Sequence, residues 1–334
     1  MSNTDVNTLE SIRESLLKLN SDEKLERVIA KSHYHFYQGV CRDKEKAKLD
    51  KTLMGQNWET DSNVDYTPTQ DIRNKVKPLL KKQARWMFGK APDIIINPIN
   101  SADKEACEEL RIFLDNILKE QHFWSETRKA FLTATIKKRV LLRVTATENN
   151  FKIRYDDLFN FSYEEIDGVI TKVRLFQEDL NNSNIEDYND KLYYIHIFSY
   201  ERFEEGKPLV ATYTKETYKG DNLEEPISVE VNEIGFEANI LPVWVIKNGG
   251  ELGDDFGESD LQDLIEPQKN YNTTVSDFKD ALRFQMFGAD SIIDGNPDDV
   301  NRLKIAPKAY CHLLSFQKIS SESIPCTKKR MRSC

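Results

Sequence analysis

Apolar residues in the first third of the chain recur three and four positions apart, which is the period of an α-helix. Between residues 9 and 38 this pattern is interrupted only by the polar run 20–22, so two helices are expected, the second closed by Gly39. Similar patterns continue further along the chain. They predict helices over residues 69–88, 102–118 and 124–138, with a short apolar strand at 93–97.

The predicted helix over residues 69–88 is amphipathic, and Pro78 inside it should produce a kink. Its apolar side includes Ile72 and Val76. The opposite side is basic and consists of Arg73, Lys75, Lys77, Lys81, Lys82 and Arg85. Charged residues at helical spacing usually face water. We therefore expect this side to be solvated or to contact a neighbouring subunit, and not to bind nucleic acid.

From residue 140 onward the pattern changes to an alternation of period two, which is typical of β-strands. Strands are expected over residues 140–146, 151–155, 169–177, 192–200, 210–218, 227–231 and 240–247. A run of helices followed by a run of strands is the arrangement of the α+β class.

The last strong pattern predicts a long helix that begins at Ser259. Gln262 completes a capping-box pattern, in which two side chains satisfy the exposed amides of a helix start. An apolar stripe then continues for about eight turns, well beyond the length of most globular helices. The stripe consists of Leu261, Leu264, Ile265, Tyr271, Val275, Phe278, Leu282 and Met286. Pro267 lies inside the predicted helix and should bend it.

The charge balance limits the classes of function. The 334 residues include 47 basic and 56 acidic side chains, giving a net charge of −9, which is opposite in sign to proteins that grip a duplex. No apolar run approaches the roughly 20 residues of a membrane-spanning helix, and the N-terminus lacks the pattern of a secretory signal. We expect a protein that crosses no membrane and stays in the cytoplasm where it is made.

Residues that could carry catalysis or bind a cofactor form no recognised pattern. The cysteines contain no CxxC pair, which predicts free thiols and no zinc site; they are Cys41, Cys107, Cys311, Cys326 and Cys334. The histidines lack the partners of a metal site or a catalytic triad; those considered are His33, His35, His122 and His196. Phosphate-binding GxxxxGK[ST] and GxGxxG loops are absent. No catalytic, cofactor or metal site is predicted, and the protein is not expected to be an enzyme.

One cluster leaves a second hypothesis open. Five acidic residues lie close together in the sequence: Asp254, Asp255, Glu258, Asp260 and Asp263. Carboxylates are the ligands that Mg²⁺ prefers, so a metal-dependent nucleic-acid enzyme is an alternative. The competing interpretation is a loop and a helix N-terminus, where acidic side chains meet the helix dipole favourably.

Several stretches carry a resemblance to a known family. They are Phe36-Tyr37-Gln38-Gly39, residues 72–76 with 84–92, residues 241–248, residues 257–261, and residues 264–265 with 271–277. The last three form a proline-led strand, an asparagine and the start of a long helix. In this order they resemble the portal proteins of long-tailed phages that infect Gram-positive bacteria, and the likeness spans most of the chain.

The resemblance implies an α+β, portal-like fold with four regions. Residues 1–248 would be a wing-like region, 249–288 a hinge and first stem helix, and 289–310 the start of a clip-like region. The tail, 311–334, is atypical, with three cysteines and a basic end. Portals continue through a return stem helix and a crown, so the chain is expected to be truncated, with a shifted reading frame as one hypothesis and a non-functional prophage remnant as an alternative.

The resemblance also implies function. Portal subunits form a closed ring, usually a dodecamer, at the capsid vertex, where double-stranded DNA passes during packaging and ejection and where head and tail connect. Its partners would be a terminase motor that hydrolyses ATP, head-completion proteins and scaffold or capsid proteins. The location would be the virion, and the host cytoplasm before assembly. An acidic conduit suits this task, because each phosphate ion pair along the path must break for DNA to advance.

Two groups of site residues follow from position within this resemblance. The wing-to-stem hinge would contain Lys247, Asn248, Gly257, Ser259 and Asp260. The channel or inter-subunit face would contain Asp277, Lys279, Asp280 and Arg283. Pro267 departs from the smooth continuation of the family's helix, which leaves the stem bent or locally repacked.

Overall fold

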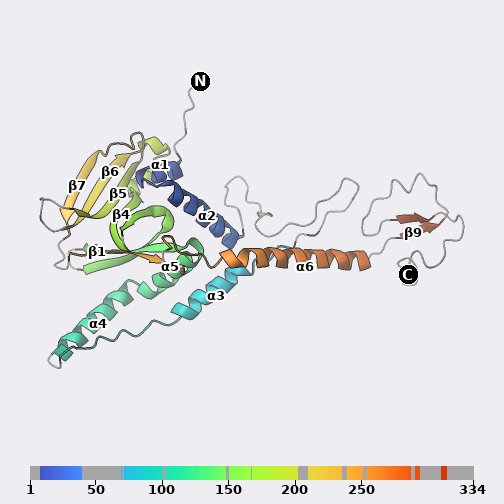
Figure 1. Ribbon diagram of the computed structural model, residues 1–334, viewed down its shortest axis with the longest axis horizontal. Coiled ribbons are helices and arrows are strands. Elements are labelled where there is room, and N and C mark those ends of the chain that lie inside the picture. Colours follow the sequence, from blue (N-terminus) through green and yellow to red (C-terminus); the bar gives the residue numbers. More distant parts are fainter. Residues whose placement is uncertain are drawn as a thin grey trace, which may run out of the picture. The chain divides into compact units, whose positions relative to one another are not determined.

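The computed structural model describes residues 8–39, 69, 71–100, 103–147, 150–166, 168–201, 210–234, 239–250, 254–286, 290–293 and 310–313. The chain divides into two compact units (Figure 1). The first unit consists of Met1–Tyr37 and Lys77–Gln262, and the second of Gln38–Val76 and Asp263–Cys334. Helices and antiparallel sheets together confirm the α+β class.

The chain begins with the two predicted helices, α1 (Leu9–Leu16) and α2 (Ser21–Gln38). Residues 17–20 lie between them. The side-chain oxygen of Asn20 accepts a hydrogen bond of 2.7 Å from the N–H of Glu23, near the start of α2. Three further helices follow, α3 (Val76–Phe88), α4 (Lys104–Glu120) and α5 (Phe123–Lys137). The predictions for α4 and α5 are confirmed. The helix predicted over 69–88 is wrong in its first part, because residues 71–75 are extended.

Two antiparallel sheets form the body of the first unit. The smaller sheet has the order β2-β1-β8, with bounds Asn150–Asp157, Arg139–Thr147 and Val243–Lys247. The larger has the order β3-β4-β5-β6-β7, with bounds Phe161–Ile166, Val169–Glu178, Leu192–Glu201, Val210–Lys219 and Ser228–Glu233. All seven strands predicted after residue 139 are present, and β3 is an addition.

Strand β3 escaped prediction because its alternation is broken. Its sequence is FSYEEI, and the pairing with β4 shifts register between Glu164 and Glu165, which marks a bulge. The opposite error occurs at residues 93–97, predicted as a strand. They are extended but pair with no strand in the described part of the chain, and Ile95 is 77% exposed. Pro92 and Pro98 flank this segment and supply no N–H donors.

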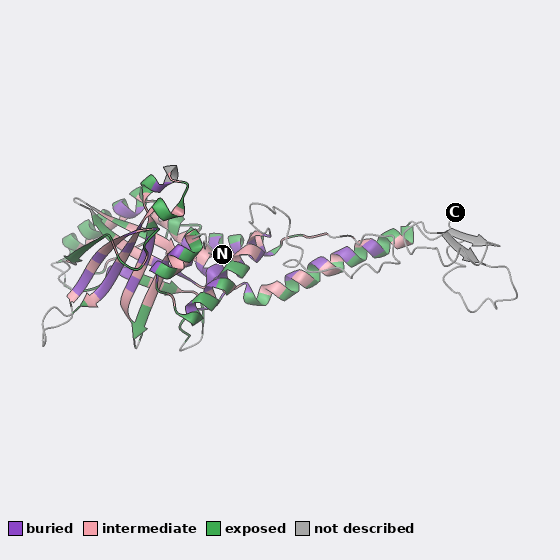
Figure 2. Ribbon diagram, turned by 90° about the horizontal axis from the view of Figure 1, so that it is seen from above, coloured by how far each residue is buried: buried purple, intermediate pink, exposed green. Residues whose placement is uncertain are grey.

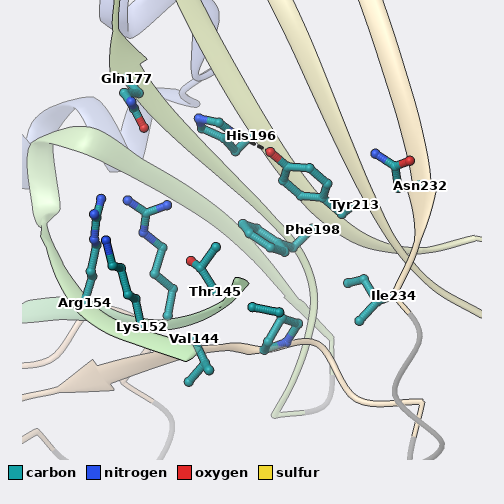
Figure 3. Close-up of a pocket in the computed structure, with 13 residues that line it drawn as sticks. Val144, Thr145, Lys152, Arg154, Gln177, His196, Phe198, Tyr213, Asn232 and Ile234 are labelled. Carbon is teal, nitrogen blue, oxygen red and sulfur yellow. Dashed lines mark hydrogen bonds between the residues drawn. The ribbon is translucent and has the colours of Figure 1, made fainter. Parts of the chain in front are cut away.

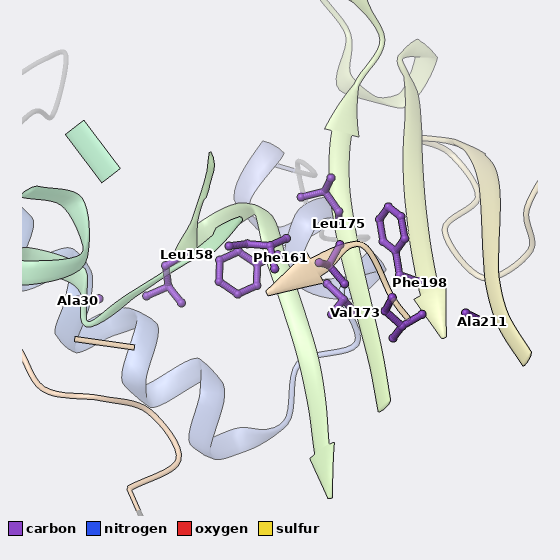
Figure 4. Close-up of a cluster of buried hydrophobic side chains, with 10 residues drawn as sticks. Ala30, Leu158, Phe161, Val173, Leu175, Phe198 and Ala211 are labelled. Atoms are coloured by element: carbon purple, nitrogen blue, oxygen red, sulfur yellow. The ribbon is translucent and has the colours of Figure 1, made fainter. Parts of the chain in front are cut away.

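Hydrophobic residues on the two faces of the larger sheet pack into two cores. One face carries Phe176, Tyr193 and Ile195 and packs on Ile12 and Leu16 of α1. The other face packs on α2, the smaller sheet and the segment between β2 and β3. Its core contains Ala30, Leu141, Leu158, Phe161, Val173, Leu175, Phe198, Ala211, Leu241 and Val243 (Figure 4). On the outer side of the smaller sheet, Ala130 and Ala134 of α5 cover Val140.

The second unit contains α6 (Ile265–Met286), preceded by the short 3₁₀ helix η6 (Gln262–Leu264), whose first residue belongs to the first unit. Helix α6 therefore starts later than predicted, at Ile265 and not at Ser259. Pro267 lies in its first turn, where the missing N–H removes no hydrogen bond. For that reason Pro267 does not require the bend that was predicted. Pro78 lies in the first turn of α3, so the same reason removes the kink predicted there.

Two short strands, β9 (Asp290–Ile293) and β10 (Tyr310–Leu313), pair in parallel within the second unit. The tail boundary expected at residue 311 falls inside β10. Cys107 is a free thiol. Cys41, Cys326 and Cys334, and most of the tail to which the frameshift hypothesis refers, lie outside the described residues.

Candidate functional site

The polar side of α6 binds an extended segment of the second unit, residues 69 and 71–75, called the strap below. Four α6 side chains spaced four residues apart accept hydrogen bonds from alternate backbone N–H groups of the strap. The bonds join Thr69 to Asp280, Asp71 to Ser276, Arg73 to Asn272 and Lys75 to Gln268, at 2.9, 3.0, 3.1 and 2.9 Å. The strap therefore runs antiparallel to α6.

The match between strap and helix is geometric. Two residues of extended chain advance about 6.6 Å, and four residues of α-helix advance about 6.0 Å. Each second strap N–H thus meets each fourth helix residue. Gln268 also donates from Nε2 to the carbonyl oxygen of Arg73, at 2.9 Å. Because these backbone groups bond to α6, the strap does not form the helical turns that its sequence predicts.

The strap makes the exposure of α6 the reverse of an ordinary amphipathic helix. Its four polar partners are at most 4% exposed: Gln268, Asn272, Ser276 and Asp280. In Figure 2 these buried positions recur along the helix. Leu261, the first residue of the predicted stripe, is buried ahead of α6. Within α6 the stripe is open from Tyr271 onward, with exposed fractions of 38% for Tyr271, 63% for Phe278, 39% for Leu282 and 76% for Met286.

Charged side chains border the strap. Lys279 and Arg73 both form ion pairs with the carboxylate of Asp71. Their hydrogen bonds, with that of Lys279 the larger influence, lower the pKa of Asp71 below its usual value. Arg283 donates from Nη1 to the hydroxyl of Thr69, at 2.7 Å.

The structure places the four residues predicted for the channel or the inter-subunit face in two settings. Lys279, Asp280 and Arg283 contact the strap. Asp277 is exposed. Gln268, Asn272 and Ser276 were not predicted as site residues. A signal was available, since with Asp280 they form a run of polar residues at every fourth position.

Four of the five residues predicted for the hinge meet at the C-terminal end of α5, in the first unit. This group, Asn248, Gly257, Ser259 and Asp260, is called the anchor below. The N–H of Asn248 donates to the carbonyl of Lys138 at 2.7 Å. Its side-chain amide donates to Asp260 Oδ1 at 2.7 Å and to the carbonyl of Glu258 at 2.9 Å. Lys247 lies apart and pairs with Glu165 at 2.9 Å.

Ser259 and Asp260 attach the chain to α5 and α3. The Ser259 hydroxyl donates to the carbonyl of Ile136 at 2.8 Å, satisfying one of the last carbonyls of α5. The same hydroxyl accepts the N–H of Leu261 at 3.3 Å. The predicted cap of the long helix is nevertheless wrong, because α6 begins at Ile265, six residues further on. The N–H of Asp260 donates to the carbonyl of Thr135 at 3.0 Å, and Gln83 donates to Asp260 Oδ2 at 2.9 Å.

Gly257 has a backbone conformation and a setting that suit only glycine. Its φ is +77°, in the left-handed region. A Cβ atom here would lie 2.9 Å from the carbonyl oxygen of Lys138 and 3.0 Å from that of Asn248. The carbonyl groups of Lys138 and Asn248 thus lie close against the backbone of Gly257, a few residues before η6.

A buried charge cluster holds the loop before the anchor. Glu23 forms ion pairs with Arg27, at 3.0 Å, and with Arg139. Arg139 is fully buried and donates to the carbonyl of Phe256 at 3.1 Å. Burial is the main cause that lowers the pKa of Arg27. The cluster joins α2, β1 and the loop ahead of Gly257 in one unit.

The acidic cluster does not converge on a metal site. Asp254 accepts a hydrogen bond from the N–H of Phe256 at 2.9 Å, and Asp260 is bonded within the anchor. Among the residues that the structure describes, no group of three His, Cys, Asp or Glu side chains could hold a metal ion. In the same described residues, no helix has the length and apolar character to cross a bilayer.

In these features side chains fix backbone segments, and an apolar face of α6 is exposed. A family model described as phage portal protein, SPP1 Gp6-like, matches residues 18–307. The chain belongs to this family of phage portal proteins, as the resemblance predicted. The family's role is structural and not enzymatic, and its members work at the capsid vertex in oligomeric rings with capsid partners and DNA. No curated protein matches the chain.

Proposed function

We propose that the chain is the repeating subunit of a closed ring that conducts double-stranded DNA through the capsid vertex during packaging and ejection. The exposed apolar stripe of α6 carries this proposal. Helix α6 buries its polar side and exposes Phe278, Leu282 and Met286, which leaves an apolar surface open on the described part of the chain. A neighbouring subunit would cover it.

The spacing of the stripe supports packing between helices. Tyr271, Val275, Phe278 and Leu282 follow one another at intervals of four, three and four residues. This is the heptad spacing of helices that pack side by side. Burying one such side chain stabilises an interface by about 1.5–3 kcal/mol, and the gain repeats at every interface of a ring. A cyclic ring requires a heterologous contact, so the stripe would meet a different surface of the next copy.

The anchor and the strap would have different roles within the subunit. The anchor fixes the backbone of residues 257–260 to α5, and the strap occupies the polar side of α6. In the proposed ring, the residues of the anchor set where the stem helix departs from the wing. Asp277 remains available to the channel or to a neighbouring stem.

The remaining tasks belong to partners. No phosphate-binding loop occurs in the sequence, so ATP hydrolysis falls to a terminase motor. Head-completion, scaffold and capsid proteins would bind the outer surfaces of the ring. The net charge of −9 favours a passage in which duplex DNA moves without tight phosphate contacts.

Light scattering and negative-stain imaging of the purified 334-residue chain test this proposal. We expect rings of about twelve subunits with closed cyclic symmetry. A monomer at all concentrations would contradict the proposal and would favour the remnant hypothesis.

A further inference from the structure

The first unit contains a cavity of about 680 Å³ between the inner faces of its two sheets. One wall comes from β1 and β2 of the smaller sheet, and the other from β4, β5, β6 and β7 of the larger one (Figure 3). This volume lies in the range of pockets that hold small molecules, roughly 300–1,000 Å³. Neither the anchor nor the strap contributes to it.

The wall from the smaller sheet is cationic. Arg143 of β1 and Arg154 of β2 are directly opposite each other in the antiparallel register, and Lys152 is opposite Thr145. Like charges directly opposite each other destabilise a sheet, and a nearby anion offsets this repulsion. Asp156 pairs with Arg143, at 2.7 Å.

The other two cations are available. Lys152 and Arg154 are exposed at the edge of the cavity and form no ion pair within the described residues. In Figure 3 both side chains extend from β2 toward the side of the cavity where Gln177 and His196 lie. Asp156 interacts electrostatically with Arg154 but forms its ion pair with Arg143. An anion entering the cavity would therefore meet two positive side chains that are exposed and not engaged in an ion pair among the described residues.

The wall from the larger sheet is aromatic. His196 stacks on Tyr213 with ring centroids 5.9 Å apart and planes at 16°, and Phe198 lies 5.3 Å from the same ring. His196 Nδ1 and the Tyr213 hydroxyl are 2.7 Å apart, which fixes both rings. Ile234, whose N–H donates to the carbonyl of Ala211 in β6, extends this apolar wall, and Pro242 lines the cavity from the side of β1. The Phe198 ring is tilted by 46° to that of Tyr213, so the two rings offer one face for stacking and one inclined contact to another ring.

We propose that this cavity binds a small aromatic anion, a flat ring that carries a carboxylate or phosphate group. The anionic group lies between Lys152 and Arg154, and the ring lies against Phe198 and Tyr213. Separating the two kinds of contact on opposite walls selects for a ligand that has both parts. An inorganic anion lacks the ring, and an uncharged aromatic compound lacks the charge.

Isothermal titration calorimetry of the full chain with 2-naphthoate tests the proposal. We expect saturable binding with one site per chain. Lys152→Gln and Arg154→Gln should each weaken binding at least about tenfold, as expected for the loss of a charged contact of about 1.4 kcal/mol. Lys119→Gln removes an exposed charge from α4 and should leave binding unchanged.

Two further titrants separate the parts of the ligand. Inorganic phosphate and 2-naphthalenemethanol should each bind at least about tenfold more weakly than 2-naphthoate. Absence of 2-naphthoate binding, or binding that both cavity variants leave unchanged, would overturn the proposal. So would equally tight binding of the uncharged alcohol. Circular dichroism of each variant confirms that it is folded, and both substituted side chains are exposed.

Discussion

The carboxylate of Asp280 accepts the backbone N–H of Thr69 with both of its oxygens, at 2.9 and 3.2 Å. These residues are 211 positions apart in sequence, and the contact begins the strap's alignment along α6. In this contact a charged side chain of α6 is buried against the backbone of the strap. The apolar stripe of α6 is exposed because the strap covers the polar side of the helix.

Replacing a strap acceptor should destabilise the second unit. Asn272→Leu leaves the N–H of Arg73 without its side-chain acceptor, at a position where Asn272 is 2% exposed. An unsatisfied buried donor costs about 1–3 kcal/mol. We expect a loss of that size in urea unfolding followed by circular dichroism. Asn270→Leu, on the exposed side of α6, should change the free energy of unfolding by less than about 0.5 kcal/mol.

The anchor can be tested with two glycines that share one backbone angle. Gly257 and Gly168 both have a φ of +77°, but no atom lies within 4 Å of a Cβ placed at Gly168. Gly168→Ala should cost about 1–2 kcal/mol for the left-handed conformation alone. Gly257→Ala adds contacts with two carbonyl oxygens and should lower the free energy of unfolding further. Equal losses in thermal unfolding would show that the close packing at Gly257 is unimportant.

The buried charge cluster predicts unequal effects for one kind of substitution. Glu23→Gln leaves Arg27 and Arg139 buried without their carboxylate, and losing one partner of a buried pair costs about 3–5 kcal/mol. Glu10→Gln breaks the ion pair with Lys31, in which both side chains are about half exposed. That loss should be at most about 1 kcal/mol. Urea unfolding of the two variants measures the difference, and similar values would contradict the role given to Glu23.

Acid should act on stability through His196. Burial, with Arg143 and Lys215 nearby, lowers its pKa to about 4 from 6.5; Tyr213 contacts its ring, and Arg154 lies on the opposite wall of the cavity. Between these values the unfolded chain binds a proton that the folded chain does not. Stability from this group is complete above pH 6.5 and falls as the pH drops toward 4, by at most about 1.4 kcal/mol per unit.

The matched variant is His196→Asn, which removes the titrating group and keeps a polar side chain. Asp156 has the opposite tendency, since burial raises its pKa, but it is present in both proteins and its effect cancels in the difference. We expect the free energy of unfolding to fall less steeply between pH 6.5 and 4 in His196→Asn. Parallel pH profiles would show that His196 is not protonated on unfolding in this range.

Local patterns predicted most elements and missed those that depend on distant partners. The strands of both sheets other than β3 could be predicted because each alternates over a core such as that around Leu175 and Phe198. The strap could not, because its N–H groups are satisfied by residues some 200 positions away. Ser259 resembled a helix cap, yet its hydroxyl bonds to α5. In both cases the structure depends on tertiary hydrogen bonds, which hold the strap on α6 and attach Ser259 to α5, although the Ser259 hydroxyl also accepts the N–H of Leu261 at 3.3 Å.

The site residues likewise could be predicted only where a sequence pattern marks them. Position within the family's pattern led to Asn248, Gly257, Ser259 and Asp260, and the structure brings them together. Their contacts with the end of α5 and with Gln83 depend on the fold and leave no local signal. The apolar stripe of α6 was predicted, but whether it lies inside the subunit or on its surface depends on the strap.

The most direct test of the assembly surface is the solution mass of α6 variants, measured by light scattering. Phe278→Asp places a charge on the stripe, and Asn270→Asp places the same charge on the exposed side away from it. We expect rings for the parent chain and for Asn270→Asp, and monomers for Phe278→Asp. Rings of unchanged mass in Phe278→Asp would contradict the claim that the stripe joins neighbouring subunits.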